Sequence, residues 1–238
     1  MKIALIGYGK MGRTIQRIAQ ERGHQIVAII DKDNQSDFAS DAFRDADVAI
    51  EFSVPQAAWQ NYQQCFAAHI PVVAGTTGWL DKMDSIKSAC ADGKQTFFYA
   101  SNFSIGVNIF FALNQHVARV MNNYPNYKVR MEETHHMHKL DAPSGTAISL
   151  AEDIIEANDS VQNWIEGESQ DSQTLPIFAT REGVVPGYHA VIYESDVDSI
   201  QIAHNAKSRE GFALGAVIAA EYTVNKKGFL TMQDMLQF

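Results

Sequence analysis

A glycine-rich turn near the start of the chain most constrains its fold. Gly7, Gly9 and Gly12 have the spacing GxGxxG, directly after the apolar run Lys2–Ile6 and at the start of a helical pattern over Lys10–Arg22. In such a strand–turn–helix the first glycine makes the tight turn, the second lets a pyrophosphate approach the backbone, and the third allows close helix–strand packing. The alternative is a purely structural turn. The strand-to-helix context favours a dinucleotide-binding fingerprint.

Short apolar runs alternate with helical patterns through residues 1–101. We predict strands at Lys2–Ile6, Gln25–Ile30, Val48–Phe52, Pro71–Ala74 and Thr96–Ala100, with further helices over Pro55–Ala68 and Leu80–Ala91. Alternation of this kind is typical of a parallel sheet that is covered by helices on both faces. The predicted fold is therefore α/β, with an N-terminal Rossmann-type parallel sheet.

The pattern changes near residue 102. We predict a long helix over Ile105–Asn123, a strand at Tyr127–Thr134, a polar mobile loop over Asn158–Gln173, strands at Leu175–Thr180, His189–Glu194 and Ser199–His204, and helices over Phe212–Thr223 and Thr231–Leu236. This order predicts a second α+β domain with a mixed or antiparallel sheet. The predicted domains are a dinucleotide-binding domain, 1–103 completed by 212–238, and a substrate-binding and oligomerisation domain, 104–211.

Composition narrows the class of partner. The 238 residues are 46% hydrophobic and carry a formal net charge of −9, which argues against nucleic acid or an anionic membrane as a partner. No apolar run is long enough to span a membrane, and the first residues fit a buried strand better than a signal peptide. Cys65 and Cys90 have no metal or redox spacing, so we expect buried thiols in a reducing cytoplasm.

Charged residues near the fingerprint address the choice of cofactor. Asp31 ends the second predicted strand, 19 residues after Gly12, where a carboxylate can bind the adenosine ribose hydroxyls. Lys32 follows directly and could accept the 2′-phosphate of NADP, or be an ordinary surface lysine. Lys10 and Arg13 are candidates near the phosphates. The sequence thus predicts NADH and/or NADPH as cofactor and leaves the preference open.

Two further loops follow predicted parallel strands. Gly75-Thr-Thr-Gly78 follows the fourth strand, and Asn102-Phe-Ser104 follows the fifth. Ligands of open parallel sheets bind at the carboxyl ends of the strands, so both loops are placed to hold the ribose and nicotinamide. Turn glycines with threonines that hydrogen-bond the loop are an equally good interpretation from the spacing alone.

A histidine cluster lies in the second half. His135, His136, His138 and Lys139 fall within five positions. Histidine titrates near neutral pH, so it can donate a proton and be recharged. The cluster could also be a surface loop or a zinc site. Adjacent histidines on an extended strand point to opposite faces, which disfavours a shared metal, and we predict no metal here.

A helix start follows the histidines. Asp141 or Ser144 can serve as its N-cap, and Pro143 suits its first turn. The backbone N–H groups near Ser144, Gly145 and Thr146 then point out of a helix N-terminus, which binds carboxylates readily. The segment is predicted to receive a substrate carboxylate beside a group of proton donors.

These motifs together resemble the dihydrodipicolinate reductase family of lysine and diaminopimelate biosynthesis, over nearly the whole chain. The most specific element runs from His135 to Ala147, and it is joined by Gly7–Gly12, Gly75–Gly78, Asn102–Ser104, Arg181-x-Gly183, Gly187-x-His189 and Ser208-Arg209. The resemblance implies reduction of 4-hydroxy-tetrahydrodipicolinate to tetrahydrodipicolinate by hydride transfer from NAD(P)H, a dicarboxylate substrate and a homotetramer built through the C-terminal sheet.

The resemblance also implies roles for individual residues. His135 is the expected general acid, and Lys139 shares the proton-donor role or binds substrate. Substrate-binding residues are expected to be His136, Lys139, Ser144, Gly145 and Thr146. Cofactor-binding residues are expected to be Gly7, Gly9, Lys10, Met11, Gly12, Asp31, Lys32, Gly75, Thr77, Ser101, Asn102 and Phe103. Which of His135 and Lys139 delivers the proton stays open.

Three departures from the family pattern stand out: Met137 replaces a polar or basic residue, Tyr188 replaces an acidic one, and the segment Asp33–Arg44 is short. Two alternatives keep the N-terminal half. One is another Rossmann-fold dehydrogenase of a small carboxylic acid. The other is a non-enzymatic dinucleotide sensor, for which this acidic chain shows no basic output helix.

Overall fold

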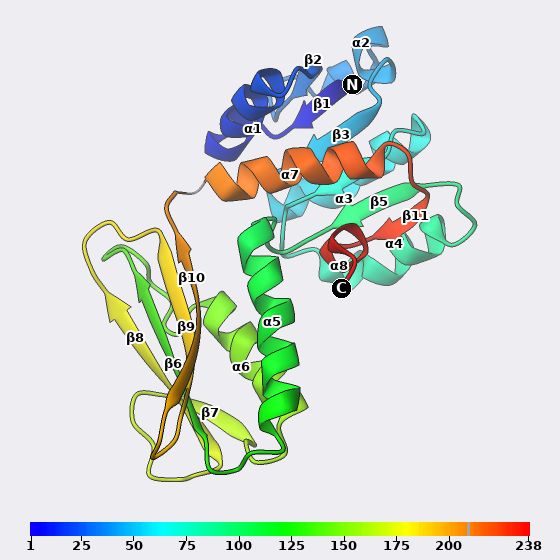
Figure 1. The fold of residues 1–238 in the computed structure, drawn as a ribbon. Coiled ribbons are helices and arrows are strands. Elements are labelled where there is room, and N and C mark those ends of the chain that lie inside the picture. The colour runs from blue at the N-terminus through cyan, green and yellow to red at the C-terminus, as the bar shows by residue number, and fades with distance from the viewer. Residues whose placement is uncertain (209) are drawn as a thin grey trace. The chain divides into compact units, whose positions relative to one another are not determined.

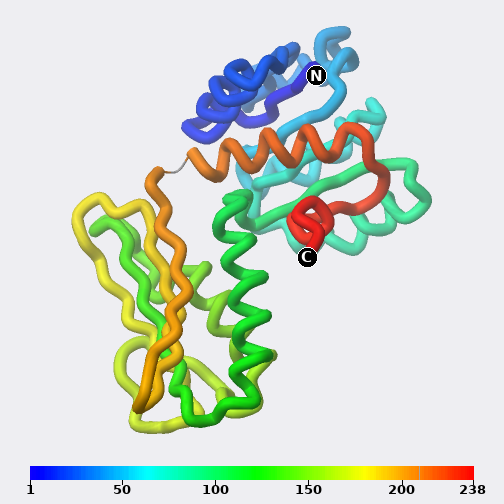
Figure 2. The backbone as a smooth tube through the Cα atoms, in the orientation of Figure 1, coloured from blue at the N-terminus to red at the C-terminus, as the bar shows by residue number. Residues whose placement is uncertain are grey.

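The structure, a computed structural model, describes residues 1–208 and 210–238. It divides into two compact units, Met1–Ile105 with Glu210–Phe238 (unit 1) and Gly106–Arg209 (unit 2). Both chain termini belong to unit 1, and the chain visits unit 2 once in between (Figure 2). The predicted domains, 1–103 with 212–238 and 104–211, have their boundaries two residues away from these. Arg209, part of one motif of the resemblance, lies outside the described residues.

Unit 1 contains a six-stranded parallel sheet (Figure 1). Its strand order is β11-β5-β4-β3-β1-β2. The strands are β1 (Lys2–Ile6), β2 (Gln25–Ile30), β3 (Val48–Glu51), β4 (Val72–Ala74), β5 (Thr96–Tyr99) and β11 (Gly228–Leu230). The helices are α1 (Lys10–Glu21), η1 (Gln35–Ala39), α2 (Asp41–Arg44), α3 (Pro55–Ala67), η2 (Leu80–Lys82), α4 (Met83–Cys90), α7 (Glu210–Thr223) and α8 (Met232–Leu236).

Helices cover both faces of this sheet, because its central strands are apolar on both sides. One core joins α1 and α7 to strand residues such as Leu5 and Ile50. The other joins α3 and α4 to strand residues such as Ile6 and Val72. β1 lies between β3 and β2, and the turn that follows Ile6 opens at the carboxyl edge of the sheet, where parallel sheets bind ligands.

Unit 2 contains a five-stranded mixed sheet with the order β10-β9-β6-β8-β7. Its elements are α5 (Ile105–Met121), β6 (Lys128–His135), α6 (Gly145–Ala157), β7 (Asn163–Glu166), β8 (Thr174–Arg181), β9 (Gly187–Glu194) and β10 (Ser199–Ala206). β6 pairs antiparallel with β9 and parallel with β8. It is therefore the central strand, and its last residues are covered on both flanks.

The helices α5 and α6 lie on one side of this sheet (Figure 1). Met131 of β6 packs there against α5 and α6 residues that include Phe110 and Leu150. Side chains alternate between the faces of a strand with period two, so Glu133 and His135 point to the same helix-covered side as Met131. This alternation brings two polar side chains into the edge of an apolar core.

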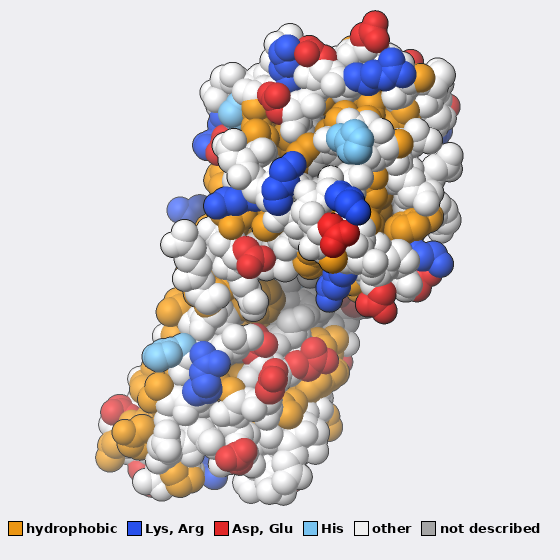
Figure 3. Space-filling view, turned by 90° about the vertical axis from the view of Figure 1, so that its right-hand side faces the viewer, with side chains coloured by type: hydrophobic (Ala, Val, Ile, Leu, Met, Phe, Trp, Pro, Cys, Tyr) orange, Lys and Arg blue, Asp and Glu red, His pale blue; other side chains and the backbone are white. Residues whose placement is uncertain are grey.

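The predicted fold class is confirmed, and the departures from the predicted elements are local. The polar segment predicted as a mobile loop contains β7, so that prediction is wrong for Asn163–Glu166. The edge strand β11 and the short helices η1 and α2 were not predicted. Among the described residues, no helix is long and apolar enough to cross a membrane. Acidic and basic side chains are intermixed on the face drawn in Figure 3.

Candidate active site

The three fingerprint glycines of unit 1 differ in the structural reason for glycine at each position. Gly7 has a φ of +88°, and a Cβ there would lie 2.1 Å from the carbonyl oxygen of Phe52. A Cβ on Gly12 would lie 2.3 Å from the carbonyl oxygen of Gly7. Gly9 is different, because its Cβ would meet no atom within 4 Å. None of the described residues requires glycine at position 9, so the open space beside it fits a ligand that approaches the backbone.

A pocket of about 280 Å³ lies beside the fingerprint. Four residues predicted to bind the cofactor line it: Gly7, Gly9, Asp31 and Lys32. A second pocket is lined by Met11, Gly75 and Thr77, which belong to the same prediction. Phe52 and Ser53 line both pockets and were not predicted. Their position directly after β3, at the carboxyl edge of the sheet, is the sequence signal that could have found them.

The remaining predicted cofactor residues lie around these pockets and do not line them. Lys10 and Gly12 are in the first turns of α1. Phe103 is buried, with its ring centroid 5.5 Å from that of Phe52. The Asn102 side chain accepts a hydrogen bond from the Ser104 N–H at 2.9 Å, and Ser101 is exposed. Their contacts with a cofactor stay predictions.

Beneath the Phe52–Ser53 turn lies a buried carboxylate, Glu51. The Tyr62 hydroxyl donates to it at 3.2 Å, the Asn61 amide donates at 3.2 Å, and the Ser53 hydroxyl donates as well. Burial raises the pKa of Glu51 despite these hydrogen bonds, because no described cation pairs with the carboxylate. The protonated, neutral form is the one that suits this site.

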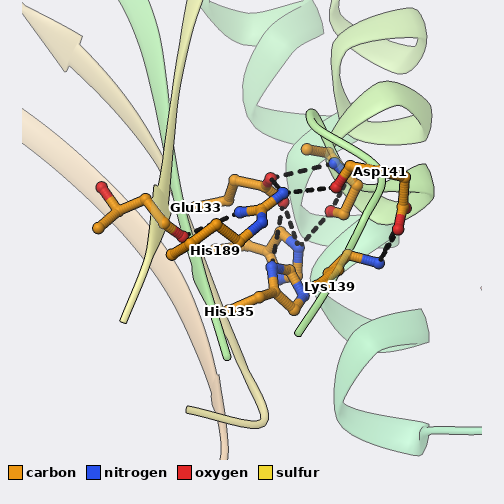
Figure 4. Close-up of polar contacts among 9 residues, drawn as sticks. Glu133, His135, Lys139, Asp141 and His189 are labelled. Carbon is orange, nitrogen blue, oxygen red and sulfur yellow. Dashed lines mark hydrogen bonds and ion pairs between the residues drawn. The ribbon is translucent and has the colours of Figure 1, made fainter. Parts of the chain in front are cut away.

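In unit 2 the polar groups gather around Glu133 (Figure 4). Its Oε1 accepts hydrogen bonds from the Ser144 N–H and from Arg181 Nη2, both at 3.0 Å. Its Oε2 lies 3.3 Å from His135 Nδ1 and 3.5 Å from His189 Nε2. The Glu133 side chain has no exposed surface. Four potential donors from three strands and one helix start thus surround a single buried carboxylate.

The charge of Glu133 follows from these contacts. Burial alone raises the pKa of a carboxyl group, but donation from His135, His189, Ser144 and Arg181 outweighs burial here and holds the pKa of Glu133 far below its usual range. Burial also lowers the pKa of His189, more than the neighbouring carboxylate raises it. At neutral pH the cluster therefore contains an ionised Glu133 and a neutral His189.

His135 is held between Glu133 and the start of β9. It is the last residue of β6, and a Cβ on Gly187 would lie 3.1 Å from its Nε2. Gly187 therefore leaves the room that the imidazole edge occupies. His136 and His138 lie beyond the strand, with ring centroids 6.4 Å apart, and His138 is exposed. The neighbouring histidines thus lie in different environments, and His135 contacts the buried carboxylate.

The predicted carboxylate receiver begins with Ser144, which is the N-cap of α6. Its hydroxyl accepts from the Ala147 N–H at 3.2 Å and also contacts His189 Nε2 at 3.0 Å. Pro143 precedes this cap, so its predicted place in the first turn is wrong. Because Glu133 takes the Ser144 N–H, the N–H groups of Gly145 and Thr146 are the ones at this helix start that no described residue accepts from.

Lys139 lies in the loop between β6 and α6. Its ammonium group contacts both carboxylate oxygens of Asp141, at 2.8 and 2.9 Å. The hydrogen bond from Lys139 lowers the pKa of Asp141 and outweighs the opposing effect of burial. Lys139 is about one-fifth exposed and Asp141 is mostly exposed, so the lysine can exchange this partner for a substrate carboxylate.

One trio among the described residues has atoms close enough to hold a metal ion. The candidate ligand atoms of Glu133, His135 and His189 all lie within 4.8 Å of one another. This trio differs from the zinc site considered from the sequence, which consisted of His135, His136 and His138. The Arg181 guanidinium on the same carboxylate opposes a further dication, and donated protons explain the short distances without one.

Glu133, Arg181 and His189 were not predicted as site residues. They come from β6, β8 and β9, and the pairing register alone brings them together, with Glu133 opposite His189 and His135 opposite Arg181. The available signal was Glu133 itself. It occupies an inward position of a strand whose earlier inward residues, Val129 and Met131, are apolar.

Comparison with known proteins assigns the chain. The fold of unit 1 is that of dinucleotide-dependent oxidoreductases. Sequence models of the dihydrodipicolinate reductase N-terminus and C-terminus match residues 1–103 and 106–236. The chain is 52% identical over 236 residues to the 4-hydroxy-tetrahydrodipicolinate reductase of Christiangramia forsetii, covering 99% of this chain and 98% of that protein. It is 34% identical to the Staphylococcus aureus enzyme of the same name, covering 99% and 100%.

A solved structure shares the whole fold. Dihydrodipicolinate reductase from Paenisporosarcina sp. TG-14, with dipicolinate bound, superposes with a TM-score of 0.78 at 23% identity over 98% of each chain. A scyllo-inositol dehydrogenase from Lactobacillus casei shares the architecture more loosely, with a TM-score of 0.54 at 12% identity, over 100% of this chain and 92% of that one. The chain belongs to the dihydrodipicolinate reductase family, as its motifs predicted.

Proposed function

We propose that His135 is the general acid of this chain's reaction and that Lys139 supplies positive charge to the substrate. The activity itself follows from the family: the chain is a 4-hydroxy-tetrahydrodipicolinate reductase of lysine biosynthesis, an NAD(P)H-dependent oxidoreductase. That assignment decides against the two alternatives considered from the sequence. The single observation that supports the role of His135 is the contact of its Nδ1 with buried Glu133, which leaves Nε2 for the substrate.

Substrate recognition is proposed for the start of α6. The relative from Paenisporosarcina binds dipicolinate, a ring with two carboxylates. Here the N–H groups of Gly145 and Thr146 point out of a helix N-terminus, and Lys139 adds a full positive charge from the preceding loop. A dicarboxylate of this class would find a backbone site for one carboxylate and a side-chain cation. Ser144 and His136 stay predicted contacts.

The nicotinamide cofactor is proposed to bind in unit 1. The open space beside Gly9 and the carboxylate of Asp31 in the same pocket fit a dinucleotide. When bound, the cofactor supplies the hydride. The second pocket, lined by Gly75 and Thr77, is the proposed place for its nicotinamide half.

The protein's own part in the reduction is position, charge and a proton. Reduction of a double bond conjugated to an electron-withdrawing group leaves negative charge at the atom that receives no hydride. His135, if protonated, can donate to that atom from Nε2 and be recharged by solvent. Lys139 and the start of α6 hold the carboxylates while the charge moves.

A homotetramer is proposed through the sheet of unit 2. The helices α5 and α6 cover only one face of that sheet. By alternation the opposite face presents the half-buried Phe178 and Tyr188 beside charged residues. Tyr188, one of the family departures, lies on this face, where its hydroxyl oxygen accepts a hydrogen bond from the Gln201 side-chain amide at 3.0 Å. Sedimentation analysis of the purified protein tests this assembly, and a stable monomer would contradict it.

The roles of His135 and Lys139 can be tested by substitution. His135→Ala is expected to lower kcat by roughly 10²–10⁴-fold, the usual loss on removing a general acid. Lys139→Ala is expected to lower kcat/KM for substrate by roughly 10–150-fold, the cost of a charge-assisted contact. Calorimetric titration of NADH should give dissociation constants within a few-fold of wild type for both variants.

His116→Ala is the matched control, because His116 is an exposed histidine on α5 outside the cluster. Its rates should equal those of the wild type. If His135→Ala and Lys139→Ala lose cofactor affinity but keep near-normal turnover at saturation, the proposed roles are wrong.

A further inference from the structure

Glu133 has a fully buried side chain that cannot touch the substrate. It is buried beneath His135 and Ser144, and Arg181 Nη2 contacts its Oε1 at 3.0 Å from the other side. Arg181 in turn donates to the carbonyl oxygen of Asp141 at 2.6 Å, which ties the carboxylate to the loop that contains Lys139. Glu133 therefore acts only through its neighbours.

The two oxygens of Glu133 face different groups. Oε1 is taken by the Ser144 N–H and by Arg181. Oε2 is left for the two imidazoles, His135 Nδ1 at 3.3 Å and His189 Nε2 at 3.5 Å. An ionised carboxylate is an acceptor only, so the nitrogen that faces it carries the hydrogen. His135 is thereby placed with Nδ1 protonated and Nε2 turned to the edge beside Gly187.

We propose that Glu133 is the positioning residue of this enzyme, which fixes the tautomer of His135, stabilises its imidazolium form and holds the first N–H of α6. The proposal rests on the proposed role of His135 as general acid. A carboxylate behind an imidazole orients the ring and favours its protonated form. Because the same carboxylate also holds Ser144, the proton donor and the predicted carboxylate receiver are fixed to one point.

Three other charged or titratable side chains lie near His135. Arg181 of β8 neutralises part of the Glu133 charge, His189 of β9 is neutral, and Lys139 of the following loop is paired with Asp141. His136 is the adjacent residue. Glu133 is thus the only described anion in contact with the His135 ring, and removal of its charge has a defined effect on the proton.

Glu133→Gln keeps the shape of the side chain and removes its charge. We expect kcat to fall by up to about 10⁴-fold, the loss observed when a carboxylate behind a catalytic histidine is replaced by its amide, while KM for substrate changes by less than about five-fold. The descending limb of the kcat/KM profile against pH should move to lower pH, because an imidazolium without a carboxylate beside it loses its proton more easily. A purely structural role would lower the amount of active enzyme without moving this limb.

Glu133→Asp separates charge from geometry. It keeps the charge and withdraws it by one methylene group, so the rate should fall while the descending limb stays near its wild-type position. Glu152→Gln, the same substitution at an exposed position of α6, is the matched control and should behave as wild type. An unchanged limb in Glu133→Gln, or equal shifts in the Gln and Asp variants, would overturn the proposal.

A measurement on the unsubstituted enzyme keeps the proposal testable even where Glu133→Gln does not fold. Imidazole nitrogen NMR, with the His135 signals assigned from His135→Ala, should show neutral His135 protonated on Nδ1. Protonation on Nε2 would contradict the proposal. If His135→Ala leaves the rate unchanged, the proposed role of His135 as general acid is wrong. If His135→Ala is inactive but Glu133→Gln keeps the wild-type rate and the wild-type position of the descending limb of the pH profile, only the positioning role of Glu133 is wrong.

Discussion

Glu51 in unit 1 and Glu133 in unit 2 are both buried carboxyl groups near the carboxyl end of a strand, yet their pKa values are shifted in opposite directions. Glu51 is surrounded by neutral donors from Ser53, Asn61 and Tyr62. Glu133 faces Arg181, a backbone N–H and two imidazoles. Burial raises the pKa of Glu51, whereas at Glu133 the donors outweigh burial and lower the pKa.

The difference shows that burial alone does not set the function of an acidic residue. A neutral Glu51 supports the backbone turn of Phe52 and Ser53, where the pocket is formed largely by main chain and glycines. An ionised Glu133 supports a site formed by side chains, in which a proton has to be in the right place. Removing the two carboxylates should therefore damage the molecule in different ways.

The largest expected contrast is in stability. Glu133→Gln removes the counter-charge of Arg181, and breaking a buried pair of this kind typically costs about 3–5 kcal/mol; partial exposure of Arg181 reduces that to roughly 2–4 kcal/mol. Glu51→Gln replaces a neutral acid by a neutral amide, and Asn61 Oδ1, which no described group donates to, can accept from it. Its cost should be under about 1 kcal/mol.

Hydrogen exchange followed by mass spectrometry can measure this contrast separately in each unit, through peptides of β6 and β3. Each variant is compared with the wild type, and because each is altered in one unit only, the two variants are controls for each other. Equal losses of protection at the two sites would mean that Glu133 is as neutral as Glu51 and would break the comparison.

The next contrast is in pH dependence, and its two signs are opposite. Glu51 has a raised pKa in the folded state, so its contribution to stability is present below the unfolded value of about 4.3 and is lost as pH rises towards the folded value. Glu133 has a depressed pKa, so its contribution is present above about 4.3 and is lost only as pH falls below that value. The slope within either window is at most about 1.4 kcal/mol per pH unit.

Unfolding of each variant at pH 4, 5.5 and 7 tests these signs. The stability of Glu51→Gln relative to the wild type should increase as pH rises. The stability that Glu133→Gln loses relative to the wild type should be constant between pH 5.5 and 7 and should become smaller at acidic pH. A deficit of Glu133→Gln that shrinks with rising pH would show that the two charge states have been assigned the wrong way round.

How far the sequence predicts the molecule also differs between the units. Apolar periodicity and the glycine spacing predict the sheet of unit 1, because both are local signals. The edge strand β11 was missed, since Gly228–Leu230 is three residues long and pairs with β5 far away in the sequence. β7 was missed because it is four residues long and lies in a largely polar segment, and its pairing with β8 makes it a strand.

The site in unit 2 was only half predictable for a related reason. His135 and Lys139 lie in one short motif with a helix start, so the sequence places them together. The contacts that determine the environment of His135 depend on register: Glu133 lies opposite His189, and His135 lies opposite Arg181. Register between strands more than 40 positions apart is decided by packing of the whole sheet, which no local pattern contains.

The smallest expected effect tests whether side-chain charges matter in unit 1 at all. Asp31 and Lys32 line the pocket beside Gly9 and are both exposed. Exposed charges interact weakly with a ligand, so we expect changes of roughly three- to ten-fold. Lys32→Ala should raise KM for NADPH more than for NADH, because only NADPH carries the 2′-phosphate. Asp31→Ala should raise KM for NADH more, because a carboxylate binds the ribose hydroxyls and repels the phosphate.

Steady-state rates with both cofactors at fixed substrate measure these effects. Asp33→Ala is the control, because Asp33 is an exposed neighbour outside the pocket lining. If each substitution affects the two cofactors equally, the main chain alone binds the cofactor here. Unit 1 would then differ from unit 2, whose site is formed by charged side chains, even more than proposed.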